Sequence, residues 1–115
     1  MSDYKNIDIT VLQAKMDREA AIARELNDTP ITEGSQKQID WAMDIRWRKA
    51  DAAAKVIRQI EDNKLDDPEM TAKQQKIIDF YKQTFANNSA KFWIENDCTS
   101  FDAYWIQNHQ AEIFK

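Results

Sequence analysis

The sequence has few of the residues that make tight turns or reactive sites. It contains one glycine, two prolines, one cysteine and one histidine in 115 residues. Because glycine enters positive φ at little cost, its scarcity argues against tight hairpins and glycine-rich phosphate loops. The lone Cys98 excludes an internal disulfide and a thiolate metal cage, and it indicates a reducing compartment.

Motifs of catalysis are missing as well. No phosphate-binding, dinucleotide-binding, nucleophile-elbow or zinc-protease pattern occurs. His109 is the only histidine, so we expect neither a catalytic triad nor a two-histidine metal site within the chain. No apolar run approaches the roughly 18 residues needed to cross a bilayer, and residues 1–10 show no secretory signal. We therefore expect a cytoplasmic protein that is not an enzyme and has no cofactor, metal or membrane partner.

What the sequence does contain is helical periodicity. The hydrophobic share of 43% argues against a disordered chain, and the length fits one domain over residues 1–115. Apolar residues recur at steps of three and four, and no segment alternates with a period of two. The sequence predicts an all-α fold, a compact bundle of four to five helices around a long central second helix.

Local signals set the expected helix bounds. The helices should cover residues 8–27, 36 to about 63, 68 or 72 up to the break at 87–89, 90–96 and 101–113. Ser35 with Gln38 matches the capping box, in which side chain and backbone bond each other reciprocally. The other expected caps are Asp8 or Thr10, Asp67 before Pro68 or Thr71 with Gln74, Ser89, and Thr99 or Ser100.

Each helix has an expected inward face. Alanines in the second helix favour the helix and allow a neighbour to approach closely. The first helix should bury Leu12, Met16, Ala20, Ala23 and Leu26, flanked by Ile9 and Val11. The last helix should bury Phe101, Tyr104, Trp105, Ile106, His109 and Ile113. Adjacent aromatics diverge by roughly 100° on a helix, so some rings must meet another element or stay exposed.

Positive charge collects on the second helix. Segment 35–60 has six basic and three acidic residues in a chain of net charge −4. The candidate partner-binding residues there are Arg46, Trp47, Arg48, Lys49, Lys55 and Arg58. They would contact phosphate or an acidic partner. The alternative is a solvated face, because Asp44, Arg48, Asp51 and Lys55 fall at steps that allow pairing along the helix.

An acidic turn follows this helix. Its candidate partner-binding residues are Glu61, Asp62, Asp66, Asp67 and Glu69. These carboxylates would imitate phosphates in a nucleic-acid-binding cleft, whereas the spacing is poor for a metal site. The alternative is a solvated turn whose acids favour the N-terminus of the next helix.

Two segments together carry a family resemblance. The residues of Gly34–Arg46 and Ala90–Ile94 fit the pattern GSxKQIxWAxxIR…AxFWI. This pattern resembles that of small uncharacterised proteins of bacterial phages, plasmids and conjugative elements. The resemblance implies a helical fold and a mobile-element context, and it supplies no activity. In physical terms, Gly34 and Ser35 would set a helix start, Trp93 would pack onto Trp41, and Arg46 would pair with an acid or a backbone carbonyl.

These observations favour a non-catalytic protein-binding module of a mobile element. Its partner would be a nucleic-acid-processing enzyme of the host, inhibited in the manner of anti-CRISPR proteins. One alternative is an accessory nucleic-acid-binding protein that uses the basic face of residues 46–58. Another alternative is a structural helical protein that forms a homo-oligomer.

Overall fold

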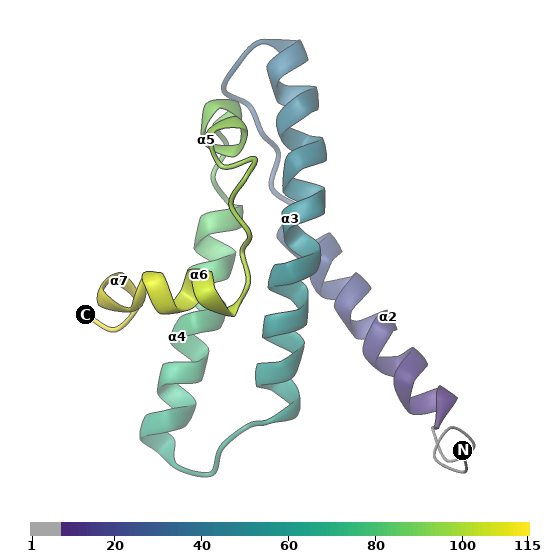
Figure 1. Cartoon of the computed structure of the whole chain (residues 1–115), viewed down its shortest axis with the longest axis vertical. Coiled ribbons are helices and arrows are strands. Elements are labelled where there is room, and N and C mark those ends of the chain that lie inside the picture. Colours follow the sequence, from purple (N-terminus) through teal and green to yellow (C-terminus); the bar gives the residue numbers. More distant parts are fainter. Residues whose placement is uncertain (1–7) are drawn as a thin grey trace.

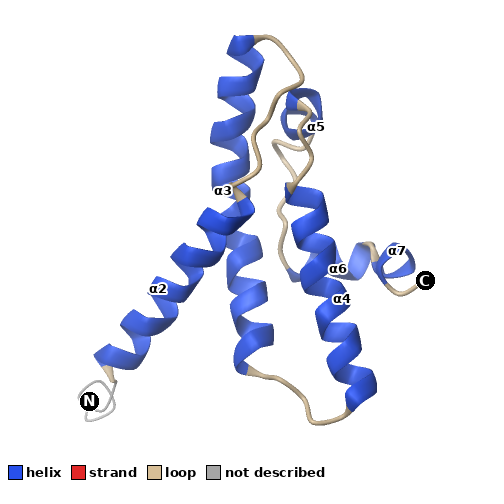
Figure 2. Cartoon of the chain, turned by 180° about the vertical axis from the view of Figure 1, so that it is seen from behind, coloured by secondary structure: helices blue, strands red, loops and turns tan. Residues whose placement is uncertain are grey.

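The computed structural model of the chain describes residues 8–115, and over that range it is all-α (Figures 1 and 2). This confirms the predicted fold class, with α3 as the long central helix. The helices of residues 8–115 are α2 (Ile9–Leu26), α3 (Gln36–Asp62), α4 (Pro68–Phe85), α5 (Ala90–Glu95), α6 (Ala103–Asn108) and α7 (Gln110–Ile113).

Side-chain caps start most of these helices where the sequence predicts. The Ser35 hydroxyl accepts from the Gln38 backbone N–H at 3.2 Å, and Gln38 Oε1 accepts from the Ser35 N–H at 3.0 Å. Asp8, Asp67 and Ser89 likewise accept backbone N–H groups of the helices that follow them. The alternative capping box at Thr71 and Gln74 is not formed, because both side chains hold the 63–65 connection through its carbonyl oxygens.

Helix α3 is the spine of the bundle, about 40 Å long. Helix α4 runs beside it, and α5 packs on its N-terminal half (Figure 1). Helix α2 crosses its C-terminal half, where the fully buried Ala50, Ala53 and Ala54 leave room for a close approach. The alanines therefore serve the packing role that the sequence predicts for them.

A short clamp joins two distant connections of the chain. The backbone N–H groups of Thr32 and Glu33 donate to the Asn88 carbonyl, and the Ala90 N–H donates to the Glu33 carbonyl at 2.9 Å. The one isolated β-bridge of the described residues, Glu33 with Ser89, forms here. The clamp places the start of α3 against the start of α5, so the two segments of the family resemblance lie in contact.

Aromatic rings fill the core between α4, α5 and α6. Phe85, Trp93, Phe101 and Trp105 form a chain of ring contacts with centroids 4.8 to 5.8 Å apart. The Tyr81 hydroxyl donates to the Phe101 carbonyl at 3.0 Å, and burial raises the pKa of Tyr81 above its ordinary value. The expected packing of Trp93 on Trp41 is wrong, because Trp93 is enclosed by this cluster and Trp41 stays half exposed.

The C-terminal region differs most from the prediction. Asp102, rather than Thr99 or Ser100, caps α6 by accepting from the Tyr104 and Trp105 N–H groups. The His109 Nδ1–H donates to the Trp105 carbonyl at 2.7 Å. An uninterrupted helix would give that carbonyl to a backbone N–H, so the helix breaks into α6 and α7. Tyr104 points outward, contrary to expectation.

Candidate partner-binding surfaces

Arg46 lies in the interior, which corrects its assignment to an exposed basic face. Its guanidinium donates to Asn27 Oδ1 at 3.0 Å and to the carbonyls of Asn27 at 3.1 Å, Thr29 at 2.7 Å and Phe85 at 3.4 Å. Burial lowers the pKa of Arg46. The side chain joins the connection after α2 to the end of α4. The sequence predicts pairing of Arg46 with an acid or a backbone carbonyl, and the structure shows backbone carbonyls.

The remaining residues of the expected basic face are dispersed. Arg48 is bound to Asp97 at 3.0 Å and to Asp44 at 3.5 Å, and Lys49 donates to the Asp97 carbonyl. Trp47 lies one residue from Arg48 on the helix and is 46% exposed. Lys55 is the cation of this set that has neither an ion pair nor a side-chain hydrogen bond within residues 8–115. Of the pairings along the helix that the alternative expects among Asp44, Arg48, Asp51 and Lys55, the described residues form the one between Asp44 and Arg48. Arg48, Lys49 and Arg58 are instead bound by residues of other elements.

Arg58 and the acidic turn are tied to the base of α2. Arg58 binds Glu19 on α2 and Asp62 on its own helix, the latter at 2.6 Å. Glu61 is bound by Arg18, and Asp67 caps α4. Of the five acids in the turn, the ones outside any ion pair or cap of the described chain are Asp66 and Glu69. The turn is therefore largely structural.

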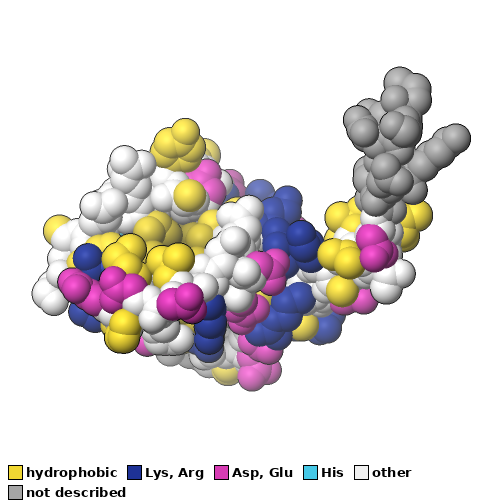
Figure 3. All heavy atoms as spheres, turned by 90° about the horizontal axis from the view of Figure 1, so that it is seen from below, with side chains coloured by type: hydrophobic (Ala, Val, Ile, Leu, Met, Phe, Trp, Pro, Cys, Tyr) yellow, Lys and Arg dark blue, Asp and Glu magenta, His cyan; other side chains and the backbone are white. Residues whose placement is uncertain are grey.

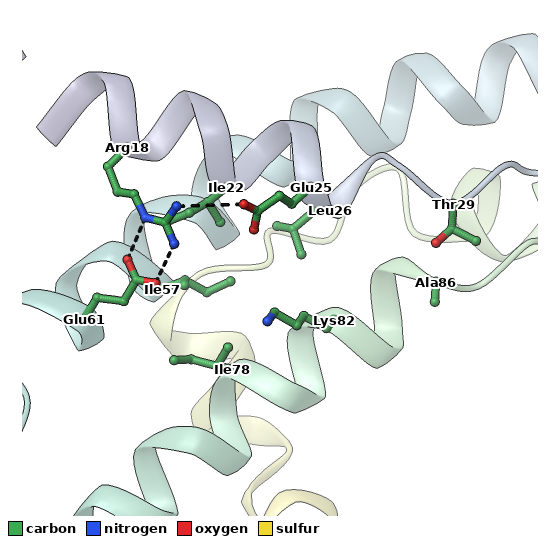
Figure 4. Close-up of a pocket in the computed structure, with 10 residues that line it drawn as sticks. All are labelled: Arg18, Ile22, Glu25, Leu26, Thr29, Ile57, Glu61, Ile78, Lys82 and Ala86. Atoms are coloured by element: carbon green, nitrogen blue, oxygen red, sulfur yellow. Dashed lines mark hydrogen bonds and ion pairs between the residues drawn. The ribbon is translucent and has the colours of Figure 1, made fainter. Parts of the chain in front are cut away.

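A pocket of about 290 Å³ opens where α2, α3 and α4 meet (Figure 4). Its floor consists of the buried aliphatic side chains Ile22, Leu26, Ile57 and Ile78. Arg18 spans one side, with its Nε 2.9 Å from Glu61 Oε1 and its terminal nitrogen 2.8 Å from Oε2. This bidentate hydrogen bond lowers the pKa of Glu61 and raises that of Arg18.

Beyond the Arg18 contact, α2 leaves the bundle and forms an arm, defined here as residues 9–17. Every residue of the arm is exposed. In Figure 1 it runs away from α3 toward the described N-terminus, and in Figure 3 hydrophobic side chains gather on it beside Lys and Arg side chains at its base. Burial on α2 begins in its C-terminal half, at Ile22, Ala23 and Leu26.

The arm carries an apolar stripe made of Ile9, Leu12 and Met16. These side chains are 74%, 50% and 56% exposed, and their spacing of i, i+3 and i+7 places them on one face. The prediction that Leu12 and Met16 belong to the core is therefore wrong. An 18-residue helix is about 27 Å long, more than twice the width of the helix it crosses, so α3 covers only part of it.

The described residues hold no further site with an evident chemistry. Between residues 8 and 115 there is no cluster of three His, Cys, Asp or Glu side chains placed to hold a metal ion. Cys98 is exposed, and the His109 ring contacts Trp105 and Phe80 in a partly buried position. In the same range no helix has the length and hydropathy to span a membrane.

The stripe is the feature that reasoning from the sequence failed to locate as surface. Its periodicity is that of an ordinary core face, so the pattern alone does not separate the two. Comparison of the chain with family models, with curated proteins and with solved structures gave no match.

Proposed function

We propose that the protein is a non-catalytic protein-binding module and that the arm is its contact element. The observation that carries the proposal is the stripe of Ile9, Leu12 and Met16, which is exposed although the rest of α2 is packed. Buried polar side-chain atoms of the described residues all have hydrogen-bond partners, so the bundle itself is a satisfied scaffold.

The stripe has the spacing used when an amphipathic helix enters an apolar groove. Anchors at i, i+3 and i+7 project from one face into such a groove. Burying the exposed half of one such side chain contributes about 1 kcal/mol to the binding free energy, because transfer free energy follows the apolar area removed from water. The arm is also pre-positioned by Arg18 and Arg58, which reduces the ordering cost of binding.

The finer form of this proposal is an inhibitor of a nucleic-acid-processing enzyme of a bacterial host, such as an anti-CRISPR protein. The family resemblance to phage and plasmid proteins supports that context, and Asp66 with Glu69 supplies free acidic groups at the α3–α4 turn. Direct binding of nucleic acid has less support, because Arg46, Arg48, Lys49 and Arg58 are engaged within the chain.

A matched pair of lysine substitutions tests the arm as a contact element. Leu12→Lys places a charge on the stripe, and Ala14→Lys places the same charge roughly 200° away on the same exposed segment. Each variant and the natural chain are immobilised and exposed to an extract of cells that naturally express the protein. We expect one partner to bind the natural chain and Ala14→Lys and to be lost from Leu12→Lys. Equal capture by all three proteins contradicts the proposal, and so does the absence of capture by a natural chain that also fails to self-associate.

A further inference from the structure

The spacing of the stripe makes it self-complementary. Ile9 and Met16 lie equally far from the midpoint between residues 12 and 13, and Leu12 lies next to that midpoint. We propose that the arm pairs antiparallel with the arm of a second copy of this chain, about a two-fold axis at that midpoint. This inference rests on the proposed function, because it names the partner of the same surface.

The register follows from helix geometry. With a rise of about 1.5 Å per residue, antiparallel pairing about the midpoint brings Ile9 level with Met16 of the second copy. Leu12 then faces Leu12 of the second copy within about 2 Å along the axis. Such an isologous arrangement covers the whole stripe on both copies with one set of contacts.

Charges beside the stripe fit this register. Asp8 directly precedes Ile9 and Lys15 directly precedes Met16, so both lie on the same edge of the stripe, two turns apart. In an antiparallel pair related by a two-fold axis, equivalent edges face each other, and Asp8 therefore lies opposite Lys15 of the second copy. The Asp8 Oδ1 caps α2, and its other carboxylate oxygen is available to that lysine. The pairing occurs twice by symmetry.

The other edge of the stripe raises no conflict. Gln13 lies there, bound through its Nε2 to Asp17 Oδ1 at 2.8 Å, and the pairing sets Gln13 near Gln13 of the second copy. Thr10 of the second copy is the residue opposite Asp17 in this register. Neither edge therefore brings like charges together, and one edge joins opposite charges.

The arm leaves room for the second copy. Packing of α2 on the bundle starts at Ile22, about 14 Å along the helix from the midpoint. The two bundles would then be separated by about 28 Å along the paired arms. Figure 1 shows the arm standing clear of α3 and α4.

The covered area sets the strength of the pairing. Three half-exposed side chains with their neighbours cover a few hundred Å², about half of the roughly 800 Å² per partner found in standard interfaces. We therefore expect a weak, reversible dimer with a dissociation constant on the order of 100 µM.

Sedimentation of the full chain tests the pairing. The natural chain, Leu12→Lys and Ala14→Lys are measured from about 10 µM to about 1 mM, which brackets the expected dissociation constant. Far-UV circular dichroism checks that all three have the same helix content. We expect the natural chain and Ala14→Lys to dimerise and Leu12→Lys to remain monomeric. A natural chain that is monomeric throughout, or a Leu12→Lys dimer of unchanged affinity, overturns the proposal.

A charge cycle tests the register itself. Lys15→Glu places a carboxylate opposite Asp8 of the second copy and should weaken the dimer about tenfold. Asp8→Asn keeps a side chain that caps the helix and removes that repulsion, so the Asp8→Asn/Lys15→Glu protein should regain most of the loss. Equal weakening in the single Lys15→Glu protein and in the double variant overturns the antiparallel register.

Failure of this inference and failure of the proposed function give different results. A monomeric chain that still captures a different protein, with capture lost in Leu12→Lys and kept in Ala14→Lys, overturns self-pairing and leaves the arm as a contact element. Loss of both the dimer and the capture in Leu12→Lys supports both statements. Unchanged dimerisation and capture in Leu12→Lys overturns both.

Discussion

At the scale of single residues, Gly34 is the most constrained position that the structure shows. Its φ is +137°, a region that favours glycine, and a Cβ built there would lie 2.9 Å from the Ala90 Cβ. The glycine and the alanine belong to the two separate segments of the family resemblance. Their contact explains in physical terms why a small residue stands in each segment at the clamp.

Replacing Gly34 should therefore destabilise the fold through two separable effects. Gly34→Ala should cost about 2–4 kcal/mol of unfolding free energy, from backbone strain together with the clash against Ala90. Ala90→Gly removes the clash and leaves the strain. In urea unfolding, the double variant should lose less than the sum of the two single losses. Strict additivity would show that the close approach is not an energetic constraint.

Arg46 is the second residue-scale constraint. Arg46→Met should lower the unfolding free energy by about 3 kcal/mol, because it removes the donor of the part-buried carbonyls of Asn27 and Thr29 and of the buried Phe85 carbonyl. Arg48→Met, two residues away on the surface, is the matched control and should cost less than about 1 kcal/mol. Urea unfolding of both variants measures the difference, and equal losses would refute the interior role of Arg46.

At the scale of elements, the Arg18–Glu61 pair ties α2 to α3 in a pH-dependent way. The hydrogen bond from Arg18 lowers the pKa of Glu61 below its ordinary value of 4.5. As the pH falls below 4.5, the unfolded chain takes up a proton at Glu61 before the folded chain does. The contribution of the pair to stability is therefore complete above 4.5 and is lost as the pH falls through the lower folded value.

Comparison with Glu61→Gln isolates this contribution. At neutral pH the natural chain should exceed the variant by about 1 kcal/mol or less, because both partners are partly exposed. The difference should shrink when unfolding free energies are measured from about pH 6 down to about pH 3. A difference that is constant across this range would contradict the assignment.

The elements also show what the sequence predicts and what it does not. The starts of α3, α4 and α5 are predictable because their caps are local, set by side chains within three residues. The exposure of Leu12 and Tyr104 is not predictable from the sequence, because it depends on which neighbour covers each helix face. The break between α6 and α7 is not predictable from helical periodicity, because it depends on the hydrogen bond from the His109 side chain to the Trp105 carbonyl.

The candidate site follows the same division. Pairing of Arg48 with Asp44 is predictable from a four-residue step along one helix. Pairing of Arg58 with Glu19 and of Arg18 with Glu61 joins different helices, and sequence spacing alone contains no signal for it. The sequence predicts for Arg46 both a place on the basic face and a pairing with an acid or a backbone carbonyl, and its hydrogen bonds to the carbonyls of Asn27 and Thr29 decide for the pairing.

At the scale of the whole molecule, the arm extends the dimensions of the protein. The radius of gyration of the Cα atoms is 16.3 Å, whereas a compact domain of this length has about 13 Å. Solution X-ray scattering of dilute Leu12→Lys, which we expect to be monomeric, should give a value near the larger figure. A value near about 13 Å would show that the arm folds back on the bundle.

The separation of arm and bundle also affects how the sequence can vary over time. Substitutions at Ile9, Leu12 or Met16 remove no contact of the core cluster, so selection for folding does not restrain them. Substitutions at Ala23, Leu26 or Arg46 do remove interior contacts, so selection for folding restrains them. As far as folding is concerned, residues 9–17 are therefore free to drift or to be exchanged for another helical epitope, while the bundle that presents them stays unchanged.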